Sequence, residues 1–300
     1  ALAAVREERL CLAGASALPH MVHMSRTAGF NPDGADFKAG LGTGLVLDDD
    51  AVSVGVGTTR ARVVALVDAQ NLVALTTRAE YVISGGTVDD PIAPSAVTPR
   101  PISAHGSADV MPLVLQGPPS ALVHVAGGGT VLREIQLGAD RTTAGRDLSL
   151  LAQHVFGIGV VEMAWSTPDN TIWLLLANRS LAALTYHLEH GVLGVRRQPL
   201  PGGWDAESLA VSPDPNGRGR LHVAAVRSKN GQPQRAHFVL SERREGVFLD
   251  CAGTYAGIPV TTLGGLEHLE GETVQIVANG AWEGEQVVTD GEVTLTAPAA

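Results

Sequence analysis

Residues 162–189 read EMAWSTPDNTIWLLLANRSLAALTYHLE, and they contain two runs of apolar residues that a turn separates. The runs are 171–177 and 181–189, and the turn between them is Asn178-Arg-Ser180. Short runs rich in Ile, Leu, Trp, Tyr and Thr between turn residues are typical of β-strands. The stretch therefore predicts a β-hairpin with little surface facing water.

A second stretch, about 45 residues further along, repeats this pattern. It opens at Ser208-Leu-Ala-Val-Ser-Pro213 and continues with predicted strands at 221–227 and 235–242. Weaker copies begin near Arg62 and near Leu115. A unit of about 40–50 residues with four strands has the size of one β-propeller blade.

The rest of the chain gives the same kind of pattern. Each predicted strand is bounded by a turn sequence such as Asn230-Gly231, and Asn-Gly is the strongest short hairpin indication. The further predicted strands are 62–67, 71–76, 81–84, 121–125 and 131–137, while 5–12 and 21–25 supply an opening blade. Helical spacing of apolar residues occurs at 147–156, where one short helix is expected.

The spacing of predicted strands and turns changes after Tyr255. Predicted strands at 273–278, 286–289 and 292–296 are separated by Asn279-Gly280 and Asp290-Gly291. We therefore predict an all-β protein with a β-propeller of four-stranded blades over residues 1–255. A small β-meander domain over residues 256–300 is expected to follow it.

Composition limits the function. The 300 residues carry a net charge of −10, which argues against a surface that grips nucleic acid, since phosphate binding needs clustered Lys and Arg. No apolar run approaches the roughly 18–20 residues of a membrane-spanning helix. Cys11 and Cys251 lack the spacing of a zinc site, and both are expected to be free, buried thiols.

The chain offers few residues in patterns that carry chemistry. His20 with His23, and His187 with Glu189 and His190, are close in sequence, but strand residues three apart point to opposite faces, so no metal site is predicted. Carboxylates that a glycosidase could use lie in turn-like contexts, where solvated loops are expected; they are Asp48-Asp49-Asp50, Asp89-Asp90, Asp205 and Glu207. No phosphate-binding loop or nucleophile elbow is present. No catalytic residue, cofactor site or metal ligand is predicted, and the chain is expected not to be an enzyme.

Several phrases of the sequence together resemble one known family. Residues 5–14 (VREERLCLAG) and 24–30 (MSRTAGF) resemble the "ENRLVFAG … SRSGDF" opening of phage tail tubular protein B, nozzle and stabilisation-type proteins. The resemblance continues through phrases in the same order, which are 71–86 (NLVALTTRAEYVISGG), Arg133-Glu134, 147–156 (DLSLLAQHVF), Met163-Ala-Trp165, Leu184-Thr-Tyr186, Glu242-Arg243 and 265–271 (GLEHLEG). It spans nearly the whole chain.

The resemblance implies a propeller-containing subunit of the virion tail. Such subunits form a hexameric ring beneath the portal and adaptor, near the tail fibres, and genome DNA passes through the ring without specific binding. An acidic lumen would let the phosphate backbone slide.

Ring contacts of this kind are heterologous and self-closing, and they are expected from two loops rich in Gly, Pro and Asp. The candidate interface residues are Asp33, Asp36, Asp48, Asp49, Asp50, Pro91, Pro94 and Pro99. Two alternatives stay open, a tail propeller that binds a receptor or glycan, and a propeller-type glycan hydrolase.

Overall fold

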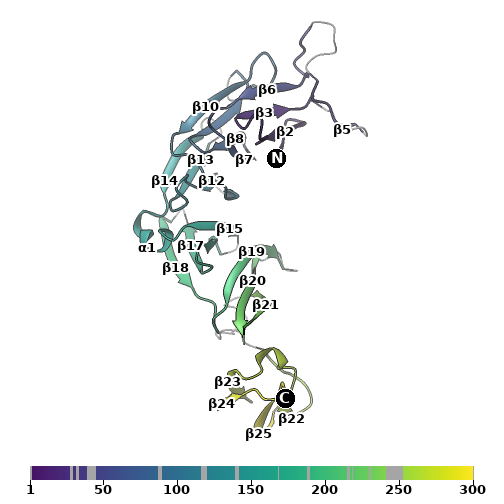
Figure 1. The fold of residues 1–300 in the computed structure, drawn as a ribbon, viewed down its shortest axis with the longest axis vertical. Coiled ribbons are helices and arrows are strands. Elements are labelled where there is room, and N and C mark those ends of the chain that lie inside the picture. The colour runs from purple at the N-terminus through teal and green to yellow at the C-terminus, as the bar shows by residue number, and fades with distance from the viewer. Residues whose placement is uncertain are drawn as a thin grey trace. The chain divides into compact units, whose positions relative to one another are not determined.

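The computed structural model describes most of the chain and divides it into two compact units, Ala1–Gly246 and Val247–Ala300. The described residues are 2–27, 30–31, 34–38, 45–86, 90–115, 120–138, 142–167, 169–187, 190–214, 217, 219–229, 231–240 and 253–299. Figure 1 shows sheets that follow one another along the first unit, from the purple N-terminal strands to the green strands β19–β21.

The first three sheets of this unit are antiparallel and have four strands each. The first contains β1 (Leu2–Arg6), β2 (Arg9–Ala13), β3 (Met21–Met24) and β6 (Val52–Gly55), with the short pair β4 (Phe30–Asn31) and β5 (Gly34–Ala35) between β3 and β6. The second contains β7 (Val63–Ala69), β8 (Asn71–Thr76), β9 (Glu80–Ser84) and β10 (Thr98–Ser103). The third contains β11 (Leu113–Leu115), β12 (Ser120–Val125), β13 (Leu132–Leu137) and β14 (Thr142–Asp147).

The last two sheets of the unit continue the series. The fourth contains β15 (Val160–Ser166), β16 (Thr171–Leu176), β17 (Leu181–His187) and β18 (Val192–Gln198). The fifth contains β19 (Asp205–Pro213), β20 (Gly219–Lys229) and β21 (Gln232–Val239). First strands of successive sheets lie side by side, with β7 against β1, β15 against β11 and β19 against β15. They form the inner edge of a β-propeller, which confirms the predicted fold class.

Alternating side chains explain why the middle sheets are buried on both faces. On β16, Ile172 and Leu174 belong to a cluster shared with the third sheet, whereas Trp173 and Leu175 belong to a cluster shared with the fifth. Successive residues of a strand point to opposite faces, so a strand between two neighbouring sheets has no polar side. This accounts for the uninterrupted apolar run at 172–176.

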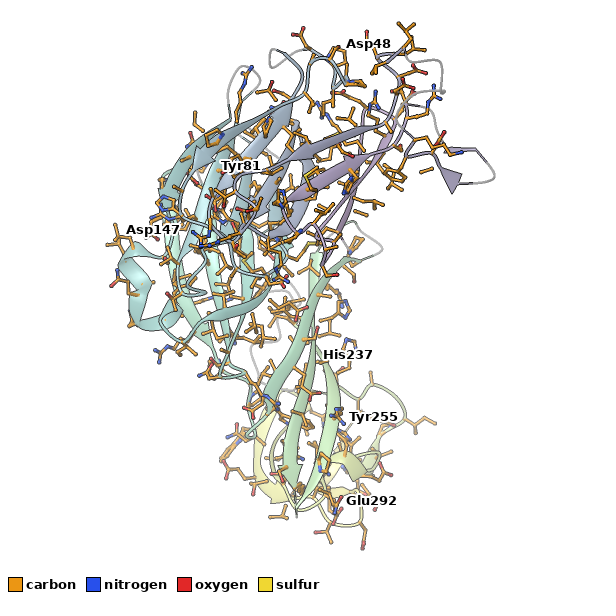
Figure 2. All side chains as sticks on the ribbon, turned by 45° about the horizontal axis from the view of Figure 1, so that its top comes forward. Asp48, Tyr81, Asp147, His237, Tyr255 and Glu292 are labelled. Carbon is orange, nitrogen blue, oxygen red and sulfur yellow. The ribbon has the colours of Figure 1, made fainter. Side chains whose placement is uncertain are left out.

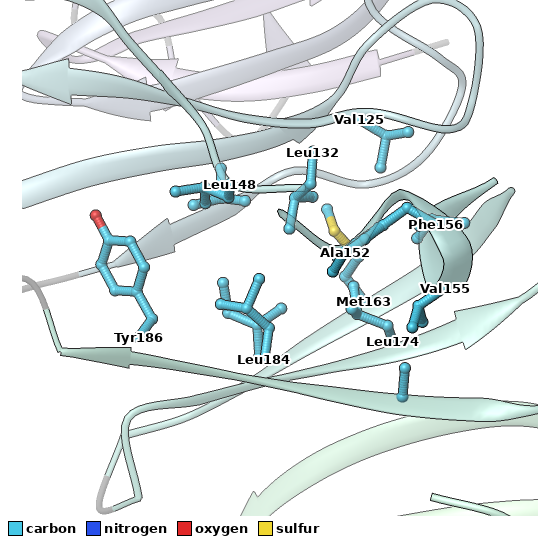
Figure 3. Packing of buried hydrophobic residues seen from close by; sticks show 14 of the residues in the cluster. Val125, Leu132, Leu148, Ala152, Val155, Phe156, Met163, Leu174, Leu184 and Tyr186 are labelled. Carbon is cyan, nitrogen blue, oxygen red and sulfur yellow. The ribbon is translucent and has the colours of Figure 1, made fainter. Parts of the chain in front are cut away.

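The predicted helix at 147–156 is shorter in the structure. Asp147 still belongs to β14, and its carboxylate accepts hydrogen bonds from the backbone nitrogen and hydroxyl of Ser149, at 2.8 and 2.6 Å. This turn ends the strand and leaves room only for a 3₁₀ turn, Leu150–Ala152, and α1 (Gln153–Phe156). Phe156 is fully buried between the third and fourth sheets (Figure 3).

The second unit has its own small core but is not the expected meander. Its strands are β22 (Val260–Leu263), β23 (Thr273–Ala278), β24 (Ala281–Val287) and β25 (Val293–Ala299), with a 3₁₀ turn at Glu267–Leu269. β25 pairs with β22, and β23 pairs only with β24. The side chain of Gln286 on β24 hydrogen-bonds to the backbone of Thr294 on β25. It accepts from the Thr294 nitrogen at 3.1 Å and donates to the Thr294 oxygen at 2.5 Å. Side-chain bonds thus replace a third ladder.

Two further expectations concern single residues and the membrane. Cys11 is a buried free thiol, and its burial raises the pKa to about 11, while Cys251 lies outside the described residues. Among the described helices, none has the length and apolar character needed to cross a bilayer.

Replacing Phe156 with Ala should lower the free energy of unfolding of the first unit by about 3–5 kcal/mol, because it leaves a cavity in a packed joint. Urea unfolding followed by circular dichroism measures the change. Leu151, in the 3₁₀ turn just before α1 and 89% exposed, is the matched control, and Leu151→Ala should change stability by less than about 0.5 kcal/mol. Equal effects of the two substitutions would contradict the packing described above.

Candidate functional site

Carboxylates of three sheets are hydrogen-bonded to the sheet that follows, at the contacts between sheets, which we call joints. Glu80 lies on the second sheet, Glu134 on the third and Glu162 on the fourth. Each accepts hydrogen bonds from residues that belong to the following sheet or lead into it. Glu80 and Glu134 are buried, whereas Glu162 is partly exposed. Because a buried charge without partners is costly, the contacts of Glu80 and Glu134 are obligatory parts of their joints.

The joint between the second and third sheets contains a serine, a histidine and a carboxylate. Ser107 donates to Glu80 Oε1 at 2.9 Å, its oxygen lies 3.0 Å from His124 Nδ1, and Ser103 also bonds to Glu80. Figure 2 labels Tyr81, the neighbour of Glu80 on β9. Glu80, Ser107 and His124 are at most 2% exposed.

These three residue types also form hydrolase triads, but the direction of the bonds differs here. The single hydroxyl proton of Ser107 is given to Glu80, so His124 donates from Nδ1 to the serine oxygen. A catalytic histidine instead accepts the serine proton. Burial lowers the pKa of His124, and the Glu80 carboxylate only partly offsets this effect. We assign the group to the stability of the joint.

The next joint is built around Glu134. The Tyr186 hydroxyl donates to Glu134 Oε2 at 2.7 Å, and Arg146 Nε donates to Oε1 at 3.1 Å. Burial, together with the bond to this carboxylate, raises the pKa of Tyr186. Gly145 leaves the space that Glu134 needs, because a Cβ at this position would lie 2.4 Å from Glu134 Cγ. Any larger residue at 145 would displace the carboxylate.

Carboxylates also lie along the inner edge of the propeller. Asp68 on β7 accepts from Arg6 at 3.0 Å. Glu162 on β15 accepts from the hydroxyl of Ser208 at 3.1 Å and from the backbone nitrogen of Leu209 at 3.2 Å. Glu207, one residue before Ser208 on β19, is bound by Arg235 at 3.0 Å. Glu162 and Glu207 thus lie on neighbouring inner strands, and each carboxylate has its own partner.

The predicted interface segment Asp48-Asp49-Asp50 is anchored by arginines of the first sheet and the turn that follows. Arg9, only 2% exposed, donates to the backbone oxygens of Asp48, Asp50 and Ser25 at 2.6, 2.6 and 2.8 Å. Burial lowers the pKa of Arg9, and the negative charge of neighbouring carboxylates acts in the opposite direction. Arg26 pairs with Asp49 at 3.0 Å and with Asp50 at 3.3 Å.

Asp50 itself is 1% exposed, and it accepts from the backbone nitrogen of Leu47 at 2.9 Å. Its carboxylate is thus turned inward, which corrects the expectation that Asp50 lies in a solvated loop, while its place in a subunit contact stays a prediction.

The other interface candidates have varied surroundings. Asp48 and Asp49 are exposed, and Figure 2 labels Asp48. Asp36 is partly exposed and accepts from the backbone nitrogen of Lys38 at 2.9 Å. The three prolines are at least partly exposed; they are Pro91, Pro94 and Pro99, the last of which lies on β10. Asp33 and Asp89 lie outside the described residues.

The histidine pairs close in sequence do not gather metal ligands. His23 Nδ1 lies 2.8 Å from the Ser53 hydroxyl, on a strand face. The rings of His187 and His190 are 6.2 Å apart, and Glu189 lies outside the described residues. No group of three or more His, Cys, Asp or Glu side chains that could hold a metal occurs among the residues described.

The residues that build the joints were present in the sequence but were not singled out for a role. Arg9, Glu80, Glu134 and Tyr186 all fall within the phrases that resemble the tail family. A charged residue that interrupts an otherwise apolar strand, such as Glu80 before YVIS, is the sequence feature that could have identified them.

Of the comparisons with known proteins, only the one with solved structures finds similar proteins. No family model matches the chain, and no curated protein does. A periplasmic gluconolactonase of Pseudomonas aeruginosa is 13% identical over 80% of this chain and 72% of its own, with a TM-score of 0.46. The Myceliophteria thermophila Cps50 (Swd1) β-propeller domain is 8% identical over 80% and 72%, with a TM-score of 0.41. An exo-β-1,3-galactanase of Phanerochaete chrysosporium is 10% identical over 94% and 74%, with a TM-score of 0.39.

These comparisons correct one expectation. The sequence predicts a protein that is not an enzyme, and this expectation is corrected, because a lactonase and a galactanase are among the similar structures. At this identity the likeness concerns the fold and transfers no substrate.

Stability should decrease below about pH 6.5 through His124. Folding lowers its pKa from the ordinary value of 6.5, so at lower pH the unfolded chain binds a proton that the folded protein excludes. The contribution of neutral His124 to the free energy of unfolding is therefore complete above about pH 6.5 and is lost as the pH falls below it. Urea unfolding between pH 5 and 7.5 should show a flatter dependence for His124→Gln than for the parent. His190→Gln, at an exposed site, should keep the parent's slope, and an unchanged slope in His124→Gln would contradict the assignment.

Proposed function

We propose that this propeller is an assembly subunit of a phage tail, of the nozzle or tail-tube type, and that its copies form a ring through which genome DNA leaves. Two observations support the proposal. One is the ordered set of phrases that resembles this family over nearly the whole chain. The other is an exposed apolar segment on a rigid base, which carries the argument.

The exposed segment is Leu45-Val46-Leu47, and its residues are 65%, 64% and 41% exposed. It directly precedes the aspartates whose backbone Arg9 binds. Contiguous exposed apolar residues mark contact sites for other proteins. Since the base of the segment is bonded to the first sheet, a partner would meet a surface that needs little ordering, which favours stable association.

The net charge fits the same role. A chain with 31 acidic and 21 basic residues does not attract the phosphate backbone by its overall charge. DNA could then move through a ring of such subunits without being retained. The portal, the adaptor and the tail fibres are the proposed neighbours in the virion.

The ring is tested by mass photometry of the purified chain over a range of micromolar concentrations. The parent should form a closed oligomer, and Leu45→Ser combined with Val46→Ser should shift it to the monomer. The matched control is Leu150→Ser with Leu151→Ser, which also removes two exposed apolar side chains and should leave the oligomer intact. A parent that remains monomeric throughout this range would rule out the proposal as stated.

A propeller-type glycan hydrolase is the second candidate, and one observation favours it. Glu162 on β15 bonds to Ser208, the neighbour of Glu207 on β19, so two neighbouring inner strands each carry an acidic residue near this contact. Glycosidases act with two carboxylates across a cleft. Glu207 is the candidate acid or base, since Glu162 is engaged in the joint.

Incubation with host polysaccharides, followed by chromatography of released oligosaccharides, tests this candidate. If it holds, Glu207→Gln should lower the release rate by about 10²–10⁴-fold, as expected for loss of an acid–base group. Glu285→Gln in the second unit is the control and should retain the parent's rate. Absence of released oligosaccharide, or equal rates in all three proteins, would exclude the role of Glu207.

A further inference from the structure

We propose that His222 and His237, on the outer face of the fifth sheet, form a binding site for a divalent transition metal such as Cu²⁺, Ni²⁺ or Zn²⁺. The inference is independent of the proposed assembly role. It starts from the close approach of two imidazole nitrogens on neighbouring strands.

The register of β20 and β21 places the two side chains on one face. His222 lies opposite Val239, and His237 lies opposite Ala224, two positions along the ladder. Such diagonal neighbours lie within reach of long side chains. His222 Nδ1 is 3.0 Å from His237 Nε2, and the rings are nearly parallel, with an interplanar angle of 6° and centroids 5.1 Å apart.

This separation suits two ligands of one metal ion. Imidazole nitrogens bind zinc at about 2.0–2.1 Å, and two ligands at right angles around such an ion lie roughly 3 Å apart. Square-planar or tetragonal geometry with nitrogen ligands is preferred by Cu²⁺ and Ni²⁺. In the metal-free protein one of these nitrogens donates a hydrogen to the other, and a bound ion would replace that hydrogen.

Ser212 provides the outer partner that a ligating histidine requires. Its hydroxyl oxygen lies 2.8 Å from His222 Nε2. When His222 carries its proton on Nε2 and donates it to Ser212, the lone pair of Nδ1 is directed toward His237. Ligating histidines generally donate their second ring nitrogen in this way, which fixes both tautomer and ring orientation.

The surroundings are compatible with a bound cation. Two arginines share this region of the sheet, and each lies near a carboxylate, Arg235 at 3.0 Å from Glu207 and Arg220 at 4.0 Å from Asp214. Their positive charge is therefore compensated nearby.

The strands that carry the histidines are also held in place. On the opposite face, Phe238 packs against the indole of Trp204 edge to face, with centroids 5.4 Å apart. The ligands thus project from a rigid sheet, which favours a defined geometry.

Both histidines are at least partly exposed in the part of the chain that the structure describes. His237 is exposed and is labelled in Figure 2 on the fifth sheet. Among the described residues, the hydrophobic clusters join this sheet only to the fourth, so none of them covers its outer face. With two protein ligands, the remaining positions of the ion would hold water or an added ligand.

Titration of the full chain with Cu²⁺ by isothermal calorimetry, with Ni²⁺, Zn²⁺ and Mg²⁺ in parallel, tests the site. We expect one Cu²⁺ per chain, bound more tightly than Zn²⁺ as the Irving–Williams order requires, and no Mg²⁺ binding. Electron paramagnetic resonance of the Cu²⁺ complex should show coupling to two nitrogens.

Variants assign the ligands. His222→Gln and His237→Gln should each weaken Cu²⁺ binding at least tenfold, and each should remove one nitrogen coupling. Ser212→Ala should weaken binding by about tenfold or more while both couplings remain, as loss of an outer partner does. His187→Gln, which alters the other neighbouring histidine pair, is the matched control and should bind like the parent.

Thermal unfolding without metal checks that the variants fold, which is expected because both histidines lie outside the buried core. No Cu²⁺ binding by the parent at about 100 μM Cu²⁺, roughly the weakest affinity of interest, would overturn the proposal. Binding that persists unchanged in both His222→Gln and His237→Gln would overturn it as well.

Discussion

Charged and polar side chains buried between apolar sheets govern how this propeller is put together. An apolar sheet face can pack against another in several registers, whereas a carboxylate such as Glu134 is satisfied only where Tyr186 and Arg146 reach it. Removing one partner of such a buried group costs about 3–5 kcal/mol, a large part of the stability of a domain. We infer that the buried carboxylates of Glu80 and Glu134 select the register in which successive sheets pack.

The same constraint separates the ends of the series from its middle. β8 and β16 are buried along their whole length because each lies between two neighbouring sheets. The fifth sheet has a described neighbour only on one side, and its other face carries His222, His237 and paired ions instead of a cluster of large apolar residues. Packing of sheets in series therefore makes the backbone of the sheets rigid, and it also leaves one face of a terminal sheet without an apolar neighbour. The segment at 45–47 and the histidine pair are alike in this respect, since each presents side chains to solvent from a backbone that a sheet holds in place.

Local sequence predicted the strands well. The predicted strand at 71–76 coincides with β8, and those at 121–125 and 171–177 differ from β12 and β16 by one residue. These strands depend on short-range properties, namely side-chain branching, alternation and turn residues, which act within a few positions of the chain. The helix predicted at 147–156 is too long. β14 extends to Asp147, and the carboxylate of Asp147 accepts a hydrogen bond from the backbone nitrogen of Ser149, so the helix can begin only after this turn. The meander failed because the pairing of β25 with β22, about thirty residues away, depends on contacts that no local pattern records.

By itself, the sequence determined an all-β chain, its strands, and a repeat of blade size, since these follow from periodicity and turn chemistry. Only the tertiary structure decided which polar residues meet. Asp50 was expected at the surface and is buried, because Arg9 draws the backbone of its segment to the first sheet. Glu162 reaches Ser208 across a joint, and His222 reaches His237 across a hairpin, 46 and 15 residues away along the chain. Contacts of this kind arise from sheet register and from the stacking of sheets, both of which are fixed only when distant parts of the chain bury their apolar faces together.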